Sequence, residues 1–99
     1  MDFFTYTIPK QGEIAGSTTA VQLPDRKCKG VIFSVRAGAV AKFYIGGEGV
    51  TVPDNATDQT SGLEIAAGQS TPLLPCTNLN LWWVIASANS DSLSYLLLT

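Results

Sequence analysis

The chain has 99 residues, enough for one small domain, because chains divide into several domains only well beyond this length. Only 14% of its residues are charged, against about 25% in ordinary soluble domains, which fits either a surface buried against other proteins or a small, weakly charged monomer. The net charge of −2 argues against nucleic acid as a partner, and the longest apolar run, LWWVIA at residues 81–86, is too short to span a membrane.

Residues 1–29 leave two interpretations open. FFTYTI and TAVQL are weak strand candidates, and PKQGEIAGSTTA holds glycines and small polar residues with little to bury. In the first interpretation this part is an extended arm that docks Phe3, Phe4 and Tyr6 on a neighbouring chain, because exposed apolar side chains are otherwise a liability. In the second, FFTYTI is the first core strand. MDFFTYTIPK lacks a basic region followed by a cleavable apolar segment, so we expect no secretory signal.

Two strands with alternating apolar residues are expected next, in GVIFSVR and VAKFYI. Their apolar positions on one face are Val31, Phe33, Val35, Ala41, Phe43 and Ile45. The AGA link around Gly38 is short enough to predict a hairpin between them. GGEG then predicts a turn into the short strand VTV, which ends at Pro53 because proline has no N–H to donate to a ladder.

The remaining residues continue the same pattern. DNATDQTSG is a polar loop in which Asp54, Asn55 and Asp58 form a solvated turn more readily than a calcium site. LEIAAGQ predicts a strand and a turn at Gly68, TPLLP an edge strand, NLNLWWVIA the strongest strand, and LSYLLLT the closing strand. About seven to nine short strands without a helical stripe predict an all-β, single-domain antiparallel sandwich or barrel, with residues 30–99 as its body.

The sequence offers little for chemistry. It contains no histidine, which excludes Ser-His-Asp and Cys-His devices and the commonest zinc ligand. The eight acidic residues are dispersed, and none lies in an apolar context that would raise its pKa for acid catalysis. We therefore expect a protein that is not an enzyme and binds neither a cofactor nor a metal. In a chain without an export signal, the two cysteines, Cys28 and Cys76, favour free thiols over a disulfide.

Two features remain as candidate binding elements. DRKCKG gathers Arg26, Lys27 and Lys29, which either orient docking on an acidic partner or form a solvated loop. Trp82 and Trp83 are neighbours on a predicted strand, so they point to opposite faces, one into the core and the other into solvent or an interface. Tryptophan is enriched at binding hot spots, which makes Trp82 a candidate contact, and it also stacks on sugar rings.

The succession AKFYIGGEGVTV, GLEIAAGQS and NLNLWWVIASANSDSLSYLLL resembles a pattern found in virion structural proteins of tailed bacteriophages, most closely the small capsid decoration (cement) proteins. The resemblance covers about 60 residues from Lys42 onward, whereas the first thirty residues match no pattern of that family. It implies a jelly-roll-like sandwich that binds the outside of the head as a dimer or trimer and clamps neighbouring major capsid subunits. The location implied is the capsid surface of the virion, reached by assembly in the host cytoplasm.

Other functions fit the same residues. The pattern is also compatible with a head-fibre base, a tail component or a connector protein. A carbohydrate-binding adhesin module that uses Trp82 or Trp83 with Tyr44 is a further alternative. An enzyme is the least favoured class, because no catalytic constellation is visible.

Overall fold

A computed structural model describes residues 9–53 and 61–99, and in these residues the chain is built from short strands and one 3₁₀ helix. In chain order the elements are β1 (Pro9–Ala15), β2 (Val21–Gln22), β3 (Gly30–Val35), β4 (Phe43–Gly46), β5 (Leu63–Ile65), β6 (Leu74–Pro75), η1 (Leu79–Leu81), β7 (Trp83–Ala86) and β8 (Ser92–Leu98). None of the described residues belongs to a helix with the length and hydropathy needed to cross a bilayer.

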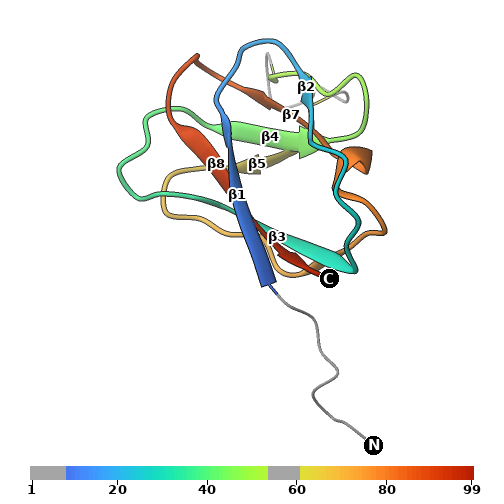
Figure 1. Cartoon of the computed structure of the whole chain (residues 1–99). Helices are drawn as coiled ribbons and strands as arrows, with labels where there is room; N and C mark the ends of the chain where they lie inside the picture. The colour runs from blue at the N-terminus through green and yellow to red at the C-terminus, as the bar shows by residue number, and fades with distance from the viewer. Residues whose placement is uncertain (1–8, 54–60) are drawn as a thin grey trace, which may run out of the picture.

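The strands form two four-stranded antiparallel sheets that face each other (Figure 1). The first sheet has the order β1-β8-β3-β6 and the second the order β2-β7-β4-β5. Every pairing between named strands is antiparallel. The predicted all-β antiparallel sandwich is therefore confirmed.

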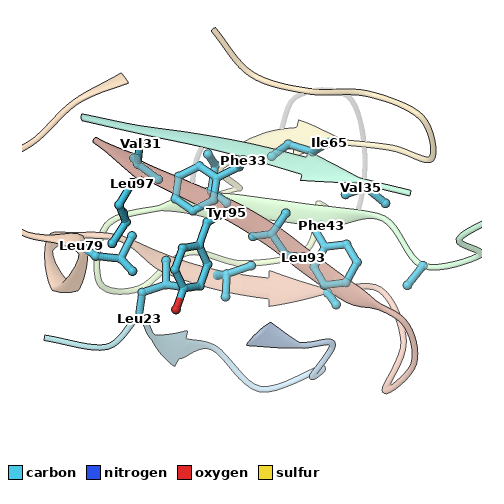
Figure 2. Close-up of a cluster of buried hydrophobic side chains, with 14 of the residues drawn as sticks. Leu23, Val31, Phe33, Val35, Phe43, Ile65, Leu79, Leu93, Tyr95 and Leu97 are labelled. Atoms are coloured by element: carbon cyan, nitrogen blue, oxygen red, sulfur yellow. The ribbon is translucent and has the colours of Figure 1, made fainter. Parts of the chain in front are cut away.

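The core lies between the sheets and is built from alternate strand residues, as a period of two requires. On β3 and β8, Phe33 lies opposite Tyr95, and each is flanked by buried aliphatic residues (Figure 2). The second sheet supplies Phe43 and Ile65, which are paired across β4 and β5. Each fully buried apolar side chain stabilises the fold by about 1.5–3 kcal/mol relative to its exposed state. All six predicted inward positions on GVIFSVR and VAKFYI are buried: Val31, Phe33, Val35, Ala41, Phe43 and Ile45.

The predicted hairpin at Gly38 is wrong. β3 lies in the first sheet between β8 and β6, and β4 lies in the second sheet between β7 and β5. Both edges of each strand are thus occupied by distant partners. The link crosses between the sheets, where the Asp91 carboxylate accepts N–H bonds of 2.9 Å from Val40 and Ala41. Long-range pairing therefore outweighs the local turn signal.

The predicted strand NLNLWWVIA is only partly correct, since its first half forms η1 and β7 begins at Trp83. The reason is Asn78, whose side-chain oxygen accepts a 3.0 Å bond from the Asn80 N–H and tightens the chain into a 3₁₀ turn. The predicted strand VTV is also wrong, because the described residues 50–52 belong to no strand and Thr51 forms an isolated parallel bridge to Ser61. TPLLP does supply an edge strand, β6.

The N-terminal part contributes strands to both sheets from residue 9 onward. β1 pairs with β8 along its whole length, from Pro9 opposite Leu98 to Ala15 opposite Ser92, and β2 pairs with β7. Phe3, Phe4 and Tyr6 lie outside the described residues, as does the loop with Asp54, Asn55 and Asp58.

Candidate docking surface

A shallow hollow of about 230 Å³ opens at one end of the sandwich, where β4 ends and η1 leads into β7. Its lining is Gly46, Gly47, Pro75, Cys76, Leu81 and Trp82. Leu81 is 59% exposed, although the leucine two positions earlier, Leu79, is completely buried. An exposed leucine beside an apolar depression is a feature of protein interaction sites.

Trp82 holds this end of the molecule to the core. Its ring contacts Phe33 edge to face, with centroids 5.7 Å apart and planes at 72°. Its backbone N–H donates to the Leu79 carbonyl at 3.0 Å and closes η1. Trp82 is thus a half-buried, preorganised wall of the hollow, while Leu81 projects from it.

The basic loop, which we define as residues 25–30, is bonded directly to the segment that carries η1. The Arg26 N–H donates to the Asn78 side-chain oxygen at 3.1 Å, and the Leu79 N–H donates to the Arg26 carbonyl at 2.9 Å. The Asn78 amide also donates to an Asp25 carboxylate oxygen at 2.7 Å. Asn78 therefore fixes the basic loop and η1 side by side.

The three cations of the basic loop are not equivalent. Arg26 is half-buried, and its guanidinium donates to the Tyr95 hydroxyl at 3.4 Å. Lys27 and Lys29 are exposed and make no ion pair within the described part of the chain. An orienting role in docking therefore falls mainly on the two lysines. We call the hollow together with Lys27 and Lys29 the docking surface.

Sequence reasoning missed two residues at this end. Leu81 appeared to be one apolar position among several in a strand, and only η1 turns its side chain outward. Lys10 is exposed on β1 opposite Leu97, while the Lys29 N–H donates to the Leu98 carbonyl, so the two lysines flank the end of β8 from opposite sides. The added positive charge, Lys10, lies on β1, which no local motif connects to the basic loop.

The aromatic residues proposed for sugar stacking are arranged unfavourably for it. Tyr44 is only 5% exposed, and its hydroxyl donates to a Glu64 carboxylate oxygen at 3.0 Å. Burial, together with this carboxylate, raises the pKa of Tyr44. Trp83 alternates with the buried Val84 and so lies on the outer side of the second sheet, half-buried. Trp82 and Trp83 thus face opposite ways. Trp83 lies on the same outer face as Tyr44, diagonally across β4 and β7, but Tyr44 has almost no exposed surface on which a sugar could stack.

The opposite end of the sandwich is organised around Asp91, whose φ of 64° places it in the left-handed region. The N–H bonds from Ala41 and Val40 hold the pKa of this carboxyl below its usual range. Nearby, the Ser87 hydroxyl accepts a 2.9 Å bond from the Lys42 N–H. These polar side chains are committed to the chain's own backbone.

Within residues 9–53 and 61–99, no three acidic, cysteine or histidine side chains lie close enough together to hold a metal ion. Comparison of the chain with known protein families, with curated proteins and with solved structures finds no match.

Proposed function

We propose that the chain is a non-enzymatic capsid decoration protein of a tailed bacteriophage, which binds the outside of the head and stabilises contacts between major capsid subunits. The docking surface is the observation that carries the proposal. It combines an exposed apolar side chain, Leu81, with a hollow anchored to the core and two uncommitted cations, Lys27 and Lys29. Such a surface suits an apolar contact on an acidic protein.

Capsid decoration requires binding free energy and no reactive group. Burying the 59% of Leu81 that is exposed contributes roughly 1–2 kcal/mol, which alone gives only a weak contact. A symmetric oligomer binds several capsid subunits at once, so its overall affinity exceeds the affinity of any single contact by a large factor. Cement proteins therefore need apolar surface and self-association together.

A second apolar strip supports self-association as a dimer or trimer. On the outer side of the first sheet, Ile32 lies opposite Leu96, which is 37% exposed. Leu73, which is 50% exposed, lies over Gly30 at the end of the same strip. This strip lies on a sheet face, whereas the docking surface lies at the end of the sandwich. One molecule can thus bind a copy and a capsid at the same time.

The strand order supports the jelly-roll detail of the proposal. Successive strands β1 to β4 alternate between the sheets, and β5 to β8 return beside them, giving β1-β8-β3-β6 opposite β2-β7-β4-β5. Such an order is the one expected of two Greek keys wrapped into an eight-stranded roll, an architecture used by viral capsid and lectin domains. Fold alone assigns no function, so this order counts only alongside the docking surface.

The test is binding to heads of the encoding phage, measured by co-sedimentation and located by cryo-electron microscopy. We expect density on the outer face of the head. The Leu81→Ser variant should bind at least about tenfold more weakly, because it removes the exposed apolar contact. Val40→Ser is the matched control, since Val40 is 86% exposed but lies at the opposite end of the sandwich, beside Asp91. Density on the tail, or equal effects of the two variants, would reject the proposal.

A carbohydrate-binding adhesin module is the weaker candidate, because the ring of Tyr44 is buried. The observation that favours this candidate is Trp83, which is half-buried on the outer side of the second sheet. A reproducible hit on a glycan array that is lost in Trp83→Ala would favour this candidate over capsid decoration.

A further inference from the structure

The cysteines lie together where the basic loop meets β6. The two Sγ atoms are 3.0 Å apart, although 48 positions separate the residues in sequence. The backbone on both sides is already bonded, because the Cys28 N–H donates to the Thr77 carbonyl at 3.1 Å and the Cys76 N–H donates to the Lys29 carbonyl at 3.4 Å. A disulfide bond is about 2.05 Å long, so a side-chain movement on the order of 1 Å would close it.

We propose that Cys28 and Cys76 are a modification site, at which exchange with a small disulfide such as oxidised glutathione forms an intramolecular disulfide that staples the basic loop to the segment before η1. The site is chemically distinct from the docking surface, although Cys76 also lines the hollow. It needs no capsid, so its test stands apart from that of the proposed function.

The two thiols take different parts in the exchange. Cys76 is half-exposed at the hollow, whereas Cys28 is only 8% exposed. The Cys76 thiolate attacks one sulfur of the glutathione disulfide, forms a mixed disulfide and releases one glutathione thiolate. The Cys28 thiolate then attacks the Cys76 sulfur and releases the second glutathione. The protein loses two protons and two electrons, and the small disulfide is reduced to two thiols.

Burial, with the hydrogen bond and charge of Cys76, raises the pKa of the Cys28 thiol to about 12. Little Cys28 thiolate therefore exists in the reduced protein near neutral pH, which leaves the first attack to the more exposed Cys76. Burial still disfavours the Cys28 thiolate in the second step, so that step should accelerate as the pH rises. The short distance between the two sulfurs offsets the low fraction of Cys28 thiolate, because the second attack is intramolecular.

The experiment treats the reduced full-length chain with oxidised glutathione and measures its intact mass, its remaining thiols after denaturation, and its melting temperature. We expect a monomer that has lost the mass of two hydrogen atoms and has no remaining thiols. Closing a loop of 48 positions should raise Tm by roughly 10–20 °C. A persistent glutathione adduct, a disulfide-linked dimer or unchanged thiols would overturn the proposal.

Two serine variants assign the steps. Cys28→Ser keeps the accessible thiol and should stop at the glutathione adduct, whereas Cys76→Ser should react little because its one thiol is buried. The double variant should show the same Tm with and without oxidised glutathione. If a serine variant fails to fold, the intact mass and the Tm of the wild-type chain, with and without oxidised glutathione, still decide the outcome.

Discussion

The two ends of the sandwich use their side chains in opposite ways. At the end where β8 begins, the Asp91 carboxylate binds the backbone of the β3–β4 link, and Val40, 86% exposed, stands there as a single apolar side chain. At the end where β8 finishes, Leu81 is exposed at the hollow, and Lys27 and Lys29 are exposed on the basic loop, which is bonded to the segment that carries η1. Polar side chains that hydrogen-bond to the chain's own backbone stabilise the fold. Exposed apolar and charged side chains, by contrast, are available to bind a partner.

Replacing Asn78 should have the largest effect on the end that carries the docking surface. Asn78→Ala removes the acceptor for the Arg26 and Asn80 N–H groups, which weakens the link between η1 and the basic loop and leaves it to backbone bonds such as that from Leu79 to Arg26. We expect a loss of about 1–3 kcal/mol in the free energy of unfolding, measured by urea denaturation, together with weaker binding to heads. Thr77→Ala, an exposed neighbour, is the control. An Asn78→Ala chain as stable as this control would show that the two segments hold together without it.

A smaller effect is expected from the exposed cations. The double variant Lys27→Ser with Lys29→Ser should bind heads roughly tenfold more weakly at low salt and show little difference at high salt, because surface charge acts mainly on steering and is screened. Lys42→Ser removes a charge from the opposite end and should leave binding unchanged. A loss that is the same at every salt concentration, or one shared by Lys42→Ser, would count against the orienting role.

The smallest effect concerns the Asp91 end and depends on pH. The pKa of Asp91 is lowered in the folded state, so its carboxylate stabilises the fold above the unfolded pKa, and this contribution disappears as the pH falls through the folded value. Tm should therefore decline below about pH 4. Asp91→Asn keeps an oxygen for the Val40 and Ala41 N–H groups but cannot titrate, so its Tm should decline less steeply. Parallel pH profiles of the two proteins would assign the decline to other carboxyls.

Sequence patterns predicted local features well and long-range placement poorly. The inward face of β3 followed from strand periodicity, and the edge position of β6 followed from its prolines. The hairpin at Gly38 failed because β8 and β7 compete for the same strand edges. In the candidate site, the basic cluster was visible in DRKCKG, but its position beside η1 depends in part on an asparagine 52 positions from Arg26.

By itself, then, the sequence determined which residues alternate into strands, where prolines and glycines interrupt them, and which common catalytic devices are excluded by the lack of histidine. Only the tertiary structure decided which strands are neighbours, that Leu81 points outward, and that Cys28 and Cys76 meet. The physical reason is the sequence separation over which each kind of interaction acts. Backbone preferences act between residues a few positions apart, whereas sheet pairing and core burial join residues that the chain separates by dozens of positions.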